Sequence, residues 1–124
     1  MIKGLGIDIV EVERIQTAVE KYADKFLNRI YTKEEIEYSE SFKNKKYVHL
    51  AARFAVKEAF SKAIGTGITQ GFKFNEICTI NEESGEPKII LDGNMKEKYG
   101  DYSFLVSISH TDSTAVAVVI MEEK

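Results

Sequence analysis

The chain has 124 residues, of which 44% are hydrophobic and 30% charged, and its formal net charge is −3. This length and balance suit one folded domain, predicted to span residues 1–124, and exclude a disordered or fibrous chain. The negative charge gives no support to a general nucleic-acid binder, and no apolar run approaches the roughly 20 residues that a membrane span requires.

The compartment is predicted from the cysteine content and the N-terminal residues. The chain holds one cysteine, Cys78, so an intrachain disulfide is impossible and a reducing compartment is favoured. Asp8 and Glu11 fall inside the first apolar run, which is unlike a secretory signal. We therefore expect a cytoplasmic protein.

The first predicted element is a strand from Ile2 to Val10, rich in Ile, Leu and Val. Gly4 and Gly6 interrupt it, which indicates a bulge or the close approach of another backbone. A helix is predicted next, because residues 11–30 contain no Gly or Pro and their apolar residues recur at helical spacing.

The rest of the chain indicates two more helices and then several strands. Thr32 followed by Glu35 matches a capping box, so a short helix is predicted to begin there. A long apolar helix follows from about Tyr47 to Ile64 and ends at Gly65. The second half predicts a short helix at Asn94–Tyr99 and strands at Glu76–Asn81, Lys88–Leu91, Phe104–Ser109 and Thr114–Met121. Helices followed by adjacent strands, without β-α-β alternation, indicate an α+β fold with a mostly antiparallel sheet packed with the long central helix.

The long helix carries two charges, Glu58 and Lys62, one turn apart among apolar neighbours. A helix that is apolar on two flanks is usually central, so these charges are predicted to face a crevice or a partner. The alternative is an ordinary surface ion pair contributing roughly 0.2–0.5 kcal/mol, and the pair considered alone favours that alternative.

Asp8 shifts the balance toward a functional interpretation. It stands between apolar residues in "GLGIDIV", where a buried carboxylate is costly unless it is paired or coordinated. Strand alternation alone leaves a position on the solvent face of an edge strand equally open. Mg²⁺ commonly takes one or two protein carboxylates and completes its shell with water and substrate phosphate, an arrangement that Asp8 and Glu58 would suit.

Three motifs follow one another along the chain. The first is "GIDIVEVER", with Gly6, Asp8 and Arg14. The second is "FAVKEAFSKA", which includes Lys57, Glu58 and Lys62 and is followed by "IGTG", and the third is "SISHT" near the C-terminus. Together the three motifs resemble those of the holo-acyl-carrier-protein synthases, the small 4′-phosphopantetheinyl transferases. The resemblance spans essentially the whole chain and implies the 4′-phosphopantetheinyl transferase fold.

The resemblance also implies a reaction, in which the phosphopantetheine arm of coenzyme A passes to a serine of apo acyl carrier protein. Adenosine 3′,5′-bisphosphate is released, and the reaction serves fatty acid biosynthesis. By resemblance, Asp8 and Glu58 bind Mg²⁺ and Lys62 contacts the CoA phosphates, so these three residues are the expected catalytic set. A role for Glu58 as general base remains the alternative. Further CoA-binding residues implied by the resemblance are Arg53, Gly65, Thr66, Ser109, His110 and Thr111. A homotrimer with active sites between subunits is implied as well.

A basic stripe offers a docking surface for the acidic carrier protein. If residues 11–30 form one helix, Arg14, Lys21, Lys25 and Arg29 lie on one arc of it. A local positive surface can therefore exist on an acidic chain, although a solvated helix with incidental sorting of charges is equally open. We predict that Arg14, Lys21 and Lys25 contact the carrier protein.

Two other functions remain open from the sequence. One is a non-catalytic module that binds CoA or a nucleotide together with a partner protein, and the other is a purely structural subunit. Among the residues outside the motif acids, His49 is interpreted as structural and Cys78 as packed rather than reactive.

Overall fold

The structure is a computed structural model that describes residues 1–69 and 71–124. Short 3₁₀ turns lie at Lys43–Lys45 and Phe74–Glu76. The helices and strands, in chain order, are β1 (Ile2–Glu11), α1 (Val12–Tyr22), α2 (Asp24–Ile30), α3 (Lys33–Glu40), α4 (Lys46–Ala63), β2 (Ile77–Asn81), β3 (Pro87–Leu91), α5 (Gly93–Tyr99), β4 (Tyr102–His110) and β5 (Thr114–Glu123).

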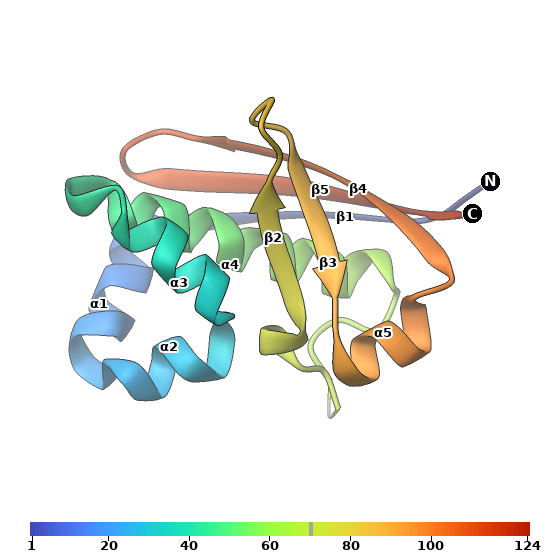
Figure 1. Cartoon of the computed structure of the whole chain (residues 1–124), viewed down its shortest axis with the longest axis horizontal. Coiled ribbons are helices and arrows are strands. Elements are labelled where there is room, and N and C mark those ends of the chain that lie inside the picture. The colour runs from blue at the N-terminus through green and yellow to red at the C-terminus, as the bar shows by residue number, and fades with distance from the viewer. Residues whose placement is uncertain (70) are drawn as a thin grey trace.

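The strands form two antiparallel groups on either side of α4. One is a three-stranded sheet in the order β1-β5-β4, and the other is the β2–β3 hairpin. Figure 1 shows α4 between them, with α1, α2 and α3 gathered at one end and α5 at the other. The predicted α+β fold, with antiparallel strands and a long central helix, is confirmed.

The contact between β1 and α4 depends on two glycines. A Cβ on Gly4 would lie 1.8 Å from the carbonyl oxygen of Ala63, and a Cβ on Gly6 would lie 1.9 Å from that of Ala59. Two residues of a strand advance about 6.6 Å and four residues of a helix about 6 Å, so the contact repeats in step. The predicted close approach is confirmed, and it places Asp8, the next residue on this face of β1, against α4.

The prediction of one helix over residues 11–30 is wrong. The chain bends at Ala23, whose φ of 48° ends α1 before α2 begins. After the bend, Phe26, Leu27 and Ile30 pack against the core. Alanine is the best helix former, so nothing in the local sequence signals this positive φ.

The outer face of the three-stranded sheet is apolar and open. Leu5, Ile7 and Ile9 of β1 are 60–68% exposed, and Leu105 of β4 is 53% exposed. Successive side chains of a strand point to opposite faces of its sheet. Gly4, Gly6 and Asp8 therefore face α4, whereas Leu5, Ile7 and Ile9 face away from α4. Within the described residues, no helix combines the length and apolar character needed to cross a membrane.

Candidate active site

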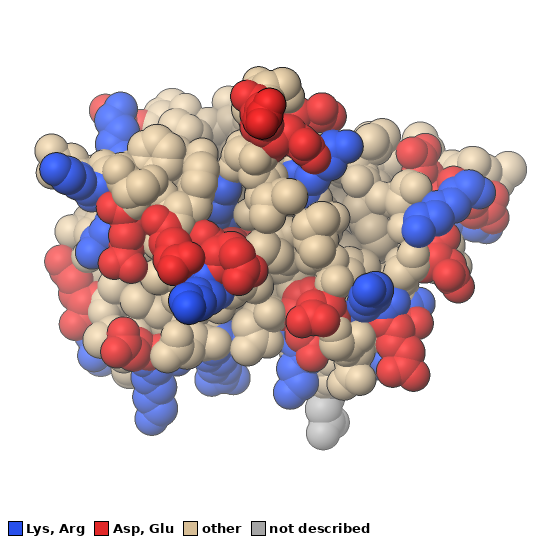
Figure 2. All heavy atoms as spheres, viewed as in Figure 1, with Lys and Arg blue, Asp and Glu red and all other residues tan. Residues whose placement is uncertain are grey.

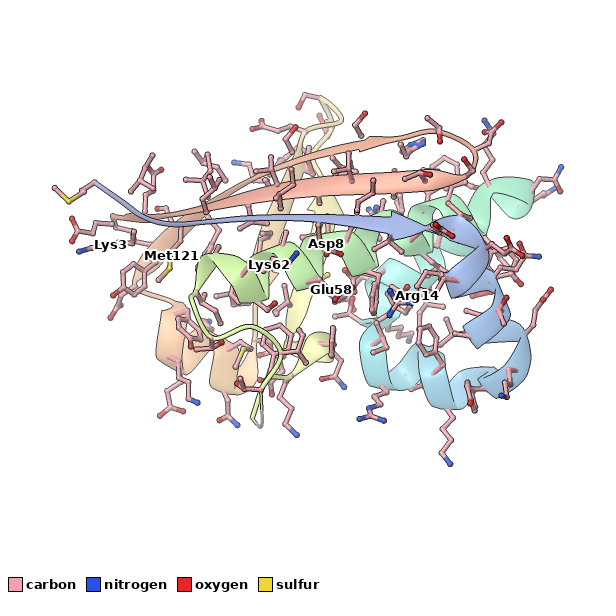
Figure 3. The ribbon with its side chains drawn as sticks, turned by 180° about the vertical axis from the view of Figure 1, so that it is seen from behind. Lys3, Asp8, Arg14, Glu58, Lys62 and Met121 are labelled. Atoms are coloured by element: carbon pink, nitrogen blue, oxygen red, sulfur yellow. The ribbon has the colours of Figure 1, made fainter. Side chains whose placement is uncertain are left out.

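The three predicted catalytic residues meet where β1 runs alongside α4. Figure 3 shows Asp8 on β1 close to Glu58 and Lys62 on α4. The Lys62 Nζ lies 3.1 Å from the Asp8 Oδ1 and donates a hydrogen bond to the Ile7 carbonyl at 2.8 Å. Lys62 therefore forms its ion pair with Asp8 of β1. The alternative, a surface ion pair with Glu58 along the same helix, is not what the structure shows.

Asp8 lies on the inner face of an edge strand. Its side chain is 14% exposed, whereas that of Lys62 is 52% exposed. The alternative that placed Asp8 on the solvent face of such a strand is wrong, because β1 turns this side toward α4. Its Oδ2 is buried and has no hydrogen-bond partner among the described residues. A buried carboxylate oxygen without a donor is costly, and a cation is the usual remedy.

Glu58 is half-buried beside Asp8. Burial is the main cause that raises the pKa of Glu58, and the negative charge of Asp8 raises it further. Arg14 and Lys62 oppose the shift with their positive charges. The two carboxylates thus repel each other in a partly desolvated site, and a positive charge there would stabilise their ionised forms.

Two carboxylates fit Mg²⁺ better than they fit a metal held by a full protein cage. Among the described residues, no group of three or more His, Cys, Asp or Glu side chains is arranged to hold a metal. Mg²⁺ usually takes one or two carboxylates and keeps sites for water and phosphate, whereas structural zinc needs four protein ligands. The free Oδ2 of Asp8 and the carboxylate of Glu58 suit the first pattern.

The predicted CoA-binding residues fall into two groups within one chain. Gly65 and Thr66 follow the end of α4, on the side of Lys62. The second group contains Arg53, in the first half of α4. Its other members, at the end of β4 and in the adjoining turn, are Ser109, His110 and Thr111. The helical rise separates Arg53 from the end of α4 by about 15 Å. The chain therefore does not bring the two groups to one point.

Arg53 and His110 have defined surroundings. Arg53 is 2% exposed; its guanidinium donates to the Asn81 Oδ1 at 2.6 Å and lies 4.1 Å from the centre of the Tyr38 ring. The exposed His110 ring lies 5.7 Å from the ring of His49. His49 also stacks on Phe42, with ring centres 3.8 Å apart. Burial, followed by the charge of Arg53, lowers the pKa of His49 to about 4, so its imidazole is neutral near pH 7.

The predicted docking residues lie on two helices, not on one. Arg14 lies over the Phe54 ring at 5.8 Å and close enough to Glu58 to lower its pKa, so it borders the acidic pair. Lys21 is at the end of α1, and Lys25 follows the bend on α2. In Figure 2, acidic side chains gather over α3 and at the tip of the β2–β3 hairpin, while basic ones project at the lower edge near α2.

Sequence reasoning missed the burial of Lys57 and Glu35. Both side chains are 0% exposed, and their charged atoms lie 2.8 Å apart. Glu35 was recognised only as half of a capping box, which the structure confirms with Thr32. The available signals were the acidic residue at position 35 and Lys57 on a mainly apolar helix. Charged residues of both types are usually exposed to solvent, so neither signal indicated burial.

The comparisons with known proteins show the family of the chain. Residues 4–119 match the family model of the 4′-phosphopantetheinyl transferase superfamily. A holo-[acyl-carrier-protein] synthase of Solibacter usitatus is 45% identical, over 98% of this chain and 99% of the relative. The crystal structure of a Bacillus anthracis holo-(acyl-carrier-protein) synthase in complex with CoA (3′,5′-ADP) is 38% identical, with a TM-score of 0.84 over 100% of this chain and 99% of that chain. A Neisseria meningitidis holo-[acyl-carrier-protein] synthase has a TM-score of 0.87 at 35% identity, over 99% and 100% of the two chains. On these matches, and with the paired acids in place between β1 and α4, the chain belongs to the 4′-phosphopantetheinyl transferase superfamily.

Proposed function

We propose that this chain transfers the 4′-phosphopantetheine arm of coenzyme A to a serine hydroxyl of apo acyl carrier protein, as a step that supplies fatty acid biosynthesis. The observation that carries the proposal is the meeting of Asp8 and Glu58, with Lys62 beside them. It is supported by relatives that carry the name holo-[acyl-carrier-protein] synthase and match nearly the whole chain.

The reaction requires charge neutralisation and alignment more than covalent help from the protein. The serine oxygen bonds to phosphorus, the bond from phosphorus to the bridging oxygen of the diphosphate breaks, and adenosine 3′,5′-bisphosphate leaves with the electron pair. Mg²⁺, held by Asp8 and Glu58, would supply positive charge to the phosphate oxygens. Lys62 adds a compact ammonium on the same side and orients the diphosphate.

The proton of the serine hydroxyl has two possible acceptors, water and Glu58. The raised pKa of Glu58 lies closer to the pKa of an effective general base than the pKa of an ordinary carboxyl group does. This direction of shift supports Glu58 as the proton acceptor. A carboxylate that ligates a metal can also act through a water molecule bound nearby. We keep metal binding as the principal role of Glu58 and proton transfer as the alternative.

A homotrimer with active sites between subunits is part of the proposal. The apolar outer face of the sheet, with Leu5, Ile7, Ile9 and Leu105, offers a surface to cover. The two separated groups of predicted CoA-binding residues would then meet across an interface. We place the enzyme in the cytoplasm, which suits its single, buried Cys78.

Carrier-protein docking is proposed at the basic residues of α1 and α2. Lys25 and Arg29 flank a hollow whose other lining residues are Tyr22 and Phe26, so positive charge surrounds an apolar centre. Such a surface suits an acidic helical partner that also presents an apolar side chain. Reversal of Lys21 and Lys25 to Glu should raise the KM for the carrier protein far more than the KM for CoA. Equal increases in both would contradict docking there.

The decisive experiment is the mass of apo acyl carrier protein after incubation with the chain, CoA and Mg²⁺. The proposal expects a mass gain of one phosphopantetheine group, and expects Asp8→Ala and Glu58→Ala to abolish it while both variants stay folded. A chain that is stabilised by CoA but yields no mass gain would instead be the non-catalytic CoA-binding module.

Sharing of sites between subunits has its own test. Asp8→Asn and His110→Ala variants, each inactive alone, should regain activity when they are unfolded together and refolded as mixed assemblies. The recovery follows because some sites then combine an intact Asp8 from one subunit with an intact His110 from another. Absence of recovery in assemblies shown to be mixed would contradict a shared site.

A further inference from the structure

The rotation of α4 about its own axis is not determined by hydrophobicity alone. The helix is buried on nearly every side, and its fully buried residues include the small Ala51, Ala55 and Ala59. Because buried residues lie on nearly every side of α4, apolar burial alone distinguishes poorly between rotations of the helix. Glu58 nevertheless has to face β1 if it is to meet Asp8. Some directional contact on α4 must therefore select that rotation.

Lys57 provides such a contact on another face of the helix. Its ammonium is fully buried, lies 2.8 Å from the Glu35 Oε1 and donates to the Phe74 carbonyl at 2.8 Å and to the Ile77 carbonyl. An ammonium has three N–H donors, and here each has an acceptor. The acceptors come from α3 and from the two ends of the turn before β2, so the position of the ammonium is fixed from several directions.

The carboxylate of Glu35 is equally well satisfied. Its Oε1 accepts from the Thr32 backbone N–H at 3.0 Å in addition to Lys57, and its Oε2 accepts from the Thr79 N–H at 2.9 Å. The ion pair thus ties α4 to the start of α3 and to β2. Buried ion pairs contribute little more stability than apolar residues of the same volume, but moving one partner away is costly. The pair is therefore better suited to selecting one arrangement than to stabilising the fold as such.

We propose that Lys57 and Glu35 are positioning residues, whose ion pair sets the rotation of α4 so that Glu58 faces Asp8. Glu58 directly follows Lys57, so the two side chains leave the helix about 100° apart. With Lys57 held toward α3 and β2, Glu58 is directed toward β1. This inference rests on the proposed function, in which Asp8 and Glu58 bind one metal ion.

The test replaces the ion pair by neutral groups of similar size, in the double variant Glu35→Gln/Lys57→Met. The glutamine side chain retains an oxygen that can accept from the Thr32 N–H. Binding of Mn²⁺, followed by electron paramagnetic resonance without CoA, should weaken at least about tenfold, which corresponds to about 1.4 kcal/mol. The Mg²⁺ concentration for half-maximal transfer should rise by a similar factor, while the KM for the carrier protein stays unchanged.

A destabilised control separates positioning from a general loss of stability. Met95 is 2% exposed on α5, and Met95→Ala should lower the melting temperature without changing Mn²⁺ binding. Wild-type Mn²⁺ affinity in the double variant would overturn the inference. So would an equal loss of affinity in Met95→Ala, compared at the same folded fraction.

A single variant covers the case in which the double variant does not fold. Glu35→Gln leaves the two carbonyl contacts of Lys57 in place and should weaken Mn²⁺ binding in the same direction by a smaller factor; unchanged binding overturns the inference. The wild-type chain separates this outcome from failure of the proposed function. If the wild type shows no Mg²⁺-dependent transfer, the proposed function itself is wrong.

Discussion

The substitution Gly6→Ala tests whether the closeness of β1 to α4 is what assembles the acidic pair. The added Cβ would lie 1.9 Å from the Ala59 carbonyl oxygen and 2.8 Å from the Ala63 nitrogen. Contacts of this kind are essentially never closer than 3.0 Å, so β1 must move away by at least about 1 Å. Asp8 is two residues further along the same strand and moves with it.

Two magnitudes follow for Gly6→Ala. Overpacking of a tight contact costs about 1–3 kcal/mol of stability, measurable as a lower midpoint of urea unfolding. A 1 Å misplacement of catalytic groups can reduce the rate about 100-fold. We therefore expect kcat/KM for phosphopantetheine transfer to fall by about that factor, at a temperature where the variant is fully folded.

Gly4→Ala is the matched control. Its Cβ would lie 1.8 Å from the Ala63 carbonyl oxygen, so the steric conflict is the same in kind and degree. Gly4 is further from Asp8 and adjoins a register shift between β1 and β5, which lets the strand absorb the displacement. The stability losses should be similar, and the activity loss much smaller. If Gly4→Ala and Gly6→Ala reduce activity equally, or if Gly6→Ala is nearly as active as wild type, the reasoning is refuted.

Three further predictions concern charges and a helix cap. The raised pKa of Glu58 means that the folded chain holds this proton more tightly than the unfolded chain, so stability falls as the pH rises from about 4.5 through the folded pKa. Asp8→Asn should make that fall in stability smaller, as measured by urea unfolding between pH 4.5 and 8. The same dependence of stability on pH in the wild type and the variant would contradict this prediction. The lowered pKa of His49, about 4 against an ordinary 6.5, means that stability is lost as the pH falls from 6.5 toward 4. His49→Phe should reduce that acid sensitivity, and an unaltered acid limb of the stability profile would argue against it. Thr32→Ala removes the side-chain cap of α3 and should cost about 1 kcal/mol in chemical denaturation with little change in kcat; no loss of stability would show that the cap contributes nothing.

The sequence was sufficient to predict those parts of the site in which a residue type is energetically unfavourable for its local surroundings. Glycines in an apolar strand and a carboxylate between apolar neighbours are both unfavourable without a reason. Gly6 therefore indicated a close backbone, and Asp8 indicated a carboxylate in need of a positive partner, which the structure supplies as Lys62. The spacing of Glu58 and Lys62 indicated a shared helix face, although it could not show that the partner of Lys62 would be Asp8.

The remaining features depend on packing that no local pattern encodes. A helical wheel separates Lys57 from Glu58, but it does not distinguish a face toward water from a face toward a buried carboxylate. The bend at Ala23 has no composition signal, and without it the position of Lys25 relative to Arg14 could not be predicted. Arg14 lies beside the acids because of how α1 docks on α4, which is a tertiary property.

The pairing of β1 with β5 has a consequence for when the enzyme becomes active during synthesis. Asp8 stands opposite Ala117, and β5 is the only strand with which β1 forms hydrogen-bonded pairs within the described residues. A nascent chain still lacking β5 carries both acids and the whole of α4, but β1 then lacks the strand whose hydrogen bonds set its register. Synthesis of β5, which supplies none of the proposed ligands, must therefore precede completion of the proposed site.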